Sequence, residues 1–336
     1  LDLRLRTNAV GQGNWQGLGG GSASASASSA GPAALPDLAG VVIRDSRVSY
    51  QDMVASGVDL RIGRVAAGVA IPVNVKLTLA RGAGAQPITL GGRFDVTLDP
   101  AARRYQLAAL ALGGTAGPGP HLAPVAWDVA APRVSVDLGA QTLNAPALTV
   151  QFAGAHLSLS ASGSRIADAP AVTGSFMLAA VAPRDLMRQL GITVPATRDP
   201  KALSKLAAAG AFSYGGHALS ASGLDIQLDD STLRGSAALT DLHTRASRFA
   251  LTLDRIDLDR YRAPEPPAPG RRAGRAGQST ALPTDLLRKL DTHGSFALGS
   301  ATIAGLQLTQ LQLALTAQDG LVHIGITRAG LYGGQD

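Results

Sequence analysis

Residues 224–229 have the sequence Leu-Asp-Ile-Gln-Leu-Asp, in which apolar and polar side chains alternate. Successive side chains of a β-strand point to opposite faces of the sheet, so this stretch predicts a strand with one apolar and one wet face. Residues 249–254 (Phe-Ala-Leu-Thr-Leu-Asp) and 311–315 (Leu-Gln-Leu-Ala-Leu) repeat the pattern. The apolar positions of the three stretches, which we expect to line the inner face of a sheet, are Leu224, Ile226, Leu228, Phe249, Leu251, Leu253, Leu311, Leu313 and Leu315.

Similar alternation recurs through much of the chain and predicts many consecutive, mostly antiparallel strands. Near the end of the chain, Asp319-Gly320 offers a tight turn between two such strands. Leu306 and Leu308 are out of phase with Leu311, which predicts a bulge near Thr309-Gln310. The expected fold class is therefore mainly β.

Helical signals are few and short. Residues 183–190 begin with Pro, carry an early acid and stop at Gly191. Residues 199–206 begin with an Asp cap followed by Pro, and residues 282–290 place basic side chains in their last turn. Three short helices cannot cover a large sheet, so it must fold over on itself, pack against a second sheet, or keep its apolar side for something else.

Two breaks in composition divide the chain. Residues 17–34 are rich in Gly, Ala and Ser, which predicts a flexible linker or long loop. Residues 263–280 combine clustered Pro with Arg and Gly, which predicts a solvated loop. We therefore expect the end of a preceding strand region at 1–16, a β-rich groove region at 35–262, and a short helix with a β-hairpin region, truncated, at 281–336.

The composition suits a broad apolar surface without large anchoring side chains. Hydrophobic residues make up 46% and aromatic residues 4% of the 336 residues, so Ala, Leu, Val and Ile must supply that surface. The formal net charge is +6, and the basic residues are scattered along the chain. A nucleic-acid surface needs basic residues that are clustered with aromatic ones or aligned on a helix, so we expect no nucleic-acid partner.

No constellation of residues indicates chemistry. The chain has no Cys, which excludes disulfides and Cys-based sites, and its 6 His residues are not spaced as metal ligands. Asp229-Asp230 fits a turn, and the acids of residues 254–260 alternate with bases, which favours surface ion pairs over acid–base catalysis. We therefore predict no catalytic, metal-binding or cofactor-binding residues and no enzyme activity.

The beginning of the chain gives an expectation about its context. It opens at Leu1 in a strand-like pattern, without a signal peptide, and the sequence contains no run of about 18 apolar residues. We therefore expect this sequence to be a segment of a longer protein.

Six segments, residues 319–321 (Asp-Gly-Leu) among them, occur in a characteristic order along nearly the whole chain. Residues 38–52 contain an inner strand, a short turn and an aromatic-x-Asp element, and residues 228–235 contain an acid-pair hairpin. Residues 248–261 carry the most specific pattern and precede the Pro-rich stretch, after which residues 282–290 and 329–334 follow. In this order and spacing the segments resemble the AsmA family of bacterial envelope proteins.

The resemblance implies a protein that lies mostly in the periplasm and is anchored in the inner membrane by an amino-terminal helix absent from this segment. It also implies a long, curved, TamB-like sheet, a repeated β-groove of taco-like shape lined with apolar side chains. Such proteins take part in outer-membrane biogenesis and in phospholipid movement between membranes. The implied partners are phospholipid acyl chains, outer-membrane assembly factors and the inner membrane.

Competing functional hypotheses follow. The first is a module that carries phospholipid along an apolar groove. The second is a scaffold or regulator of outer-membrane protein assembly and targeting, which has a dry interior and carries no lipid. The nine apolar positions fit a groove lining and an ordinary packed core equally well. An enzyme on a β-solenoid is the least favoured hypothesis, because no convergent pair of acids is visible.

Overall fold

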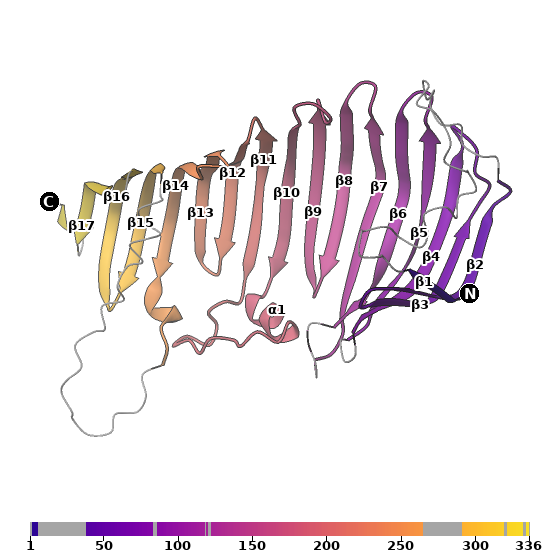
Figure 1. The fold of residues 1–336 in the computed structure, drawn as a ribbon. Coiled ribbons are helices and arrows are strands. Elements are labelled where there is room, and N and C mark those ends of the chain that lie inside the picture. Colours follow the sequence, from indigo (N-terminus) through magenta and orange to yellow (C-terminus); the bar gives the residue numbers. More distant parts are fainter. Residues whose placement is uncertain are drawn as a thin grey trace. The chain divides into compact units, whose positions relative to one another are not determined.

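The structure is a computed structural model that describes residues 2–5, 38–82, 86–117, 119, 122–264, 291–318, 321–331, 334 and 335. The chain divides into two compact units, which are described separately. In each unit the strands lie side by side in one layer (Figure 1). This confirms the predicted mainly β, mostly antiparallel fold, and in the described residues the strand pairing leaves the sheet open.

Unit 1 comprises residues 1–168 and 189–192. Its strands are β1 (Asp2–Leu5), β2 (Val41–Tyr50), β3 (Met53–Ile62), β4 (Ala70–Arg81), β5 (Ile88–Asp99), β6 (Arg104–Ala116), β7 (Val125–Asp137), β8 (Thr142–Phe152) and β9 (Ala155–Ser164). From β2 to β9 each strand pairs antiparallel with the next, whereas β1 pairs with β2 in parallel. The strand expected within residues 1–16 is therefore part of this sheet.

Unit 2 comprises residues 169–188 and 193–336. Its elements are β10 (Ala171–Val181), α1 (Pro183–Gln189), β11 (Leu206–Gly215), β12 (Ala218–Leu228), β13 (Ser231–Asp241), β14 (Ala246–Asp257), the 3-10 helix η1 (Leu258–Tyr261), β15 (Thr292–Ile303), β16 (Leu306–Gln318), β17 (Leu321–Leu331) and β18 (Gly334–Gln335). Consecutive strands pair antiparallel, except that β14 and β15 are parallel. A parallel pair needs a long crossover, and the Pro-rich stretch lies within this connection.

Several long strands contain bulges at residues with positive φ. Gly57 in β3, Ala109 in β6, Gly223 in β12 and Gln310 in β16 have φ between 50° and 57°, and the register shifts beside each of them. The extra residue in a bulge changes which side chains face each side of the sheet. Gln310 confirms the bulge that the phase change among the leucines predicted.

The predicted helices have three different outcomes. Helix α1 confirms the one expected near 183–190, with Pro183 first and Asp185 in its first turn. The helix predicted at 199–206 is wrong, since a turn at Asp199 leads directly into β11. There the backbone N–H groups of residues 203–205 donate to the carboxylate of Asp229, so a distant side chain takes the groups that a helix would use.

Other predictions fall on residues that the structure does not describe. The helix at 282–290, the linker at 17–34 and most of the loop at 263–280 lie outside the described residues. The same is true of Asp319-Gly320, although Gln318 and Leu321 pair directly in the antiparallel hairpin of β16 and β17.

Deep burial is sparse in the described residues. No large side chain is fully buried there, and the buried apolar residues are Ile71, Val73, Val125, Ala131, Ala153, Ala202, Leu298, Ala301 and Ala317. A packed two-layer core would remove many large apolar side chains from solvent. The described strands therefore form sheets that are one layer deep.

Candidate functional site

The strand register brings the nine predicted apolar residues together on one face of unit 2, here called the apolar face. Directly paired residues lie on the same side of a sheet, so the pairs can be followed laterally from strand to strand. The first row contains Ile226, Leu233, Leu253, Leu298 and Leu311. The second contains Leu224, Gly235, Leu251, Phe296, Leu313 and Ile326. The third contains Ala237, Phe249, Gly294, Leu315 and Ile324.

Leu228 extends this face at the end of β12, where it pairs with Leu206 and Ser231. All nine residues are partly exposed, and none is buried. Leu298, which lies between Leu253 and Leu311 in the first row, is more enclosed, at 8% exposed. In the described part of unit 2, the apolar face thus stays partly open to solvent.

Glycines let neighbouring aromatic rings lie close to the sheet on this face. A Cβ atom added at Gly294 would lie 2.5 Å from ring atoms of Phe249 on the neighbouring strand, so the ring lies over the glycine. A Cβ at Gly210 would lie 3.1 Å from the ring of Phe176 and also 3.1 Å from Leu224. Rings that lie over glycines are held close to the sheet and produce a low surface instead of projecting anchors.

The opposite face of unit 2 is polar. Asp225 pairs with Arg234, and their side chains form an ion pair of 2.9 Å between Oδ2 and Nε. The same lateral row continues through Thr252, Ala297, Gln312 and Arg328. The two faces therefore separate as the alternation predicted, with Asp225 and Gln312 on the wet side.

Unit 1 carries a comparable apolar row that the sequence interpretation did not assemble. The row crosses eight strands through Ile43, Leu60, Val75, Gly92, Leu112, Val129, Val150 and Leu157. Glycine at position 92 and the bulge at Ala109 interrupt the period-two pattern along β5 and β6. The available signal is the alternation within other strands of the unit, such as β4, β8 and β9.

The carboxylate clusters serve as structural hydrogen-bond acceptors. The carboxylate of Asp229 accepts the Tyr261 hydroxyl at 2.7 Å and the N–H groups of Leu203, Ser204 and Lys205 at 2.7–3.1 Å. Partial burial raises the pKa of Asp229, but these hydrogen bonds outweigh it and hold the pKa below its usual value. Burial, and then the bond to Asp229, raises the pKa of Tyr261.

Asp259 and Arg260 complete this arrangement at the end of β14. The Asp259 carboxylate accepts the N–H groups of Ala304 and Gly305, each at 2.7 Å, and these bonds lower its pKa. Arg260 donates from Nε to Asp199 at 2.7 Å and also contacts Asp230. Asp229 and Asp259 thus accept hydrogen bonds that fix the backbone, and Asp199 and Asp230 contact Arg260, as the sequence interpretation expected of turn and ion-pair residues.

The structure also bears on metal binding and membrane spanning. The described residues contain no group of three or more His, Asp or Glu side chains arranged to hold a metal ion. Over the same part of the chain, no helix combines the length and apolar character needed to cross a membrane.

Comparisons with known proteins do not place the chain. No family model, no curated protein and no solved structure matches it. The resemblance to the AsmA family rests on the sequence segments alone and stays a prediction.

Proposed function

We propose that this chain is the periplasmic part of an AsmA-like protein anchored in the inner membrane, and that it carries phospholipid by holding acyl chains on the apolar face. This function involves no catalysis and contributes to outer-membrane biogenesis. The observation that carries it is the continuity of the apolar rows across β12 to β17, together with the partial exposure of all nine predicted residues.

The chemistry of the three rows suits acyl chains. They contain no charged side chain, and removing each methylene of an acyl chain from water is favourable by about 0.8 kcal/mol. The glycines under Phe249 and Phe176 keep the face low, so no single pocket fixes a chain in one position. A surface of this kind favours movement of a lipid along the rows over tight binding at one place.

The polar face of the same strands restricts the proposed lipid to one side of the sheet. Asp225, Arg234 and Gln312 keep that side in water, so a lipid is expected on one face only. This one-sidedness provides matched positions for an experiment, because neighbouring residues on one strand lie on opposite faces.

Photocrosslinking in cells tests the proposal. A photoreactive amino acid is placed at Ile226 or Leu313 on the apolar face, with Asp225 and Gln312 as the matched positions on the polar face. Mass spectrometry of the adducts is expected to find phospholipid at Ile226 and Leu313 and none at Asp225 and Gln312. If the folded protein yields no lipid at either inward position, or equal amounts on both faces, the lipid-carrying function is wrong.

A second candidate is a scaffold or regulator of outer-membrane protein assembly that carries no lipid. It is favoured by β17, where Leu321, Ile324 and Ile326 are 62–65% exposed. In the described residues, β17 pairs with β18 only at Gly330 and Leu331, and an otherwise unpaired strand edge can add an extended segment of a partner. Protein adducts from Ile324, combined with no lipid at Ile226 or Leu313, would favour this alternative.

A further inference from the structure

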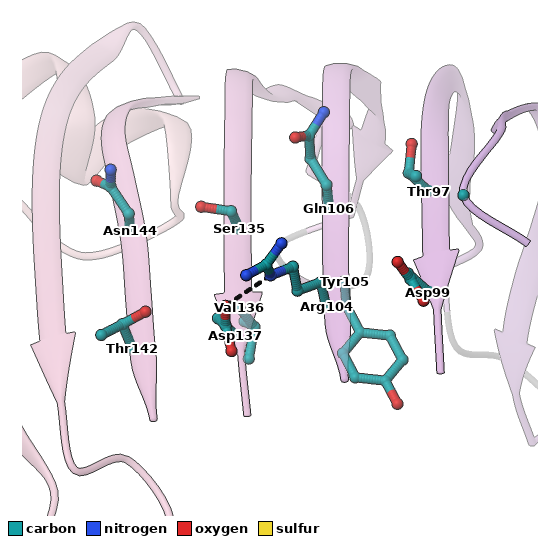
Figure 2. Close-up of a pocket in the computed structure, with 11 residues that line it drawn as sticks. Thr97, Asp99, Arg104, Tyr105, Gln106, Ser135, Val136, Asp137, Thr142 and Asn144 are labelled. Carbon is teal, nitrogen blue, oxygen red and sulfur yellow. Dashed lines mark hydrogen bonds and ion pairs between the residues drawn. The ribbon is translucent and has the colours of Figure 1, made fainter. Parts of the chain in front are cut away.

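The polar face of unit 1 contains a hollow of about 490 Å³ over the ends of β5 to β8, here called the polar hollow. Four of its residues, Thr97, Gln106, Ser135 and Asn144, form one lateral row in direct register. A second row beside it contains Asp99, Arg104, Asp137 and Thr142. Figure 2 shows both rows, with the ring of Tyr105 pointing away from them.

One wall of the hollow is formed by the turn at Gly68. The N–H of Gly68 donates to the carbonyl oxygen of Leu98 at 2.9 Å, which holds this turn against β5. The site is therefore bounded by backbone at one side and floored by four neighbouring strands. Its volume lies within the range of about 300–1,000 Å³ that is typical of small-molecule sites.

The first row presents hydrogen-bonding groups that the protein does not use. Among the described residues, the side chains of Thr97, Gln106, Ser135 and Asn144 have no hydrogen-bond partner, although they lie on adjacent strands. Thr97, Gln106 and Ser135 are half-buried. Hydroxyl and amide side chains each offer both a donor and an acceptor, so the row can match a ligand that does the same at every position.

The second row disfavours anionic and apolar ligands. Arg104 donates from Nε to Asp137 at 2.9 Å, and the other oxygen of Asp137 accepts the N–H of Ala140 at 2.8 Å. Arg104 and Asp137 thus offset each other's charge, and the additional carboxylate of Asp99 gives the lining a net negative charge that disfavours anions. An apolar ligand would strip water from both rows without replacing its hydrogen bonds. Among uncharged ligands, one rich in hydroxyl groups matches the unused donors and acceptors of the first row best.

We propose that the polar hollow binds a neutral carbohydrate, whose hydroxyl groups exchange hydrogen bonds with the row from Thr97 to Asn144 and donate to Asp99. The site lies in unit 1, on the face opposite to the apolar row of that unit, and does not depend on the function proposed above. Neutral hydrogen bonds exposed to water contribute modestly, so the expected Kd is about 1 mM.

Nuclear magnetic resonance of the full chain, labelled with nitrogen-15, tests this site through its side-chain amides. Maltotriose is the soluble probe, and octyl glucoside micelles present the same chemistry as the headgroup of an amphiphile. The amide signals of Gln106 and Asn144 are expected to shift saturably with one probe or both. Gln151 is the internal control, because it lies on β8 outside the hollow and pairs with Asp128 and His156.

The two probes distinguish the source of the sugar. A shift with maltotriose identifies a site for free oligosaccharide, and a shift with octyl glucoside alone identifies a site for a glycolipid headgroup. Absence of a shift at Gln106 and Asn144 with both probes overturns the proposal, and so does an equal shift at Gln151.

Substitutions provide the second readout. Gln106→Leu and Asn144→Leu should each weaken binding about fivefold, the value of one neutral hydrogen bond, whereas Gln151→Leu should leave it unchanged. An unchanged backbone spectrum shows that each variant is folded. Binding that survives both substitutions in one chain places the sugar elsewhere and refutes the site.

Discussion

Truncation of two leucines in the β15–β16 hairpin separates an open apolar face from a packed core. Leu298→Ala and Leu313→Ala each remove three carbon groups, worth at most about 2.4 kcal/mol of transfer free energy if the side chain is fully buried. Leu298 is only 8% exposed, so its truncation forfeits most of this transfer free energy and also leaves a partial cavity. Its truncation should cost about 2.5–4 kcal/mol.

Leu313 has a different environment on the same hairpin. It is partly exposed, its neighbours in the row are Phe296 and Ile326, and Ile326 is itself 64% exposed. Truncation there should forfeit only part of the transfer term and create no enclosed cavity, so the expected cost is about 1 kcal/mol.

Native-state hydrogen exchange of the amides in β15 and β16 measures both costs as the free energy of opening the same hairpin. Equal losses for the two variants, both above about 2.5 kcal/mol, would refute the reasoning, because Leu313 would then be covered as thoroughly as Leu298. That result would favour a dry interior and the scaffold function.

Two further predictions concern the backbone and the acids. Gly235→Ala should destabilise unit 2 by more than about 2 kcal/mol in urea denaturation, because φ is +139° and the new Cβ would lie 1.9 Å from the carbonyl oxygen of Ala250. Gly57→Ala, which meets nothing within 4 Å at φ +56°, should cost only about 1 kcal/mol, and equal costs would contradict the steric argument. The stability should also fall as the pH drops below about 4, because hydrogen bonds lower the pKa values of Asp229 and Asp259 in the folded chain and the unfolded chain binds protons first. This contribution to stability is complete above the ordinary Asp pKa and is lost as the pH falls through the lower pKa values of the folded chain. Asp229→Asn should therefore flatten a plot of unfolding free energy against pH. An unchanged slope would contradict this role for Asp229.

Sequence alternation predicted strands from segments whose side chains keep a period of two for five or six residues. The strands β12, β14 and β16 were recognised in this way, and the register placed their leucines on one face. This two-residue period follows directly from the pleat of a strand, so it can be recognised in the sequence without knowing which strands are neighbours.

Features that depend on lateral pairing were not predictable. The parallel pairing of β14 with β15 and the row across unit 1 require the order of the strands, and the polar hollow requires four strands in register. The false helix at 199–206 has the same origin. Its local signals are sound, but Asp229 supplies acceptors from another hairpin and stabilises an extended entry to β11.

The single-layer architecture also shapes how each unit should lose its structure. Within each unit nearly all contacts join strands that follow one another in the sequence, so every strand depends mainly on its two neighbours. Such an array resembles a row of repeats, in which stability is a sum of local terms and nearest-neighbour couplings. Unfolding should then begin at terminal strands such as β17 and advance inward strand by strand, and damage at one bulge should remain local instead of melting the whole sheet.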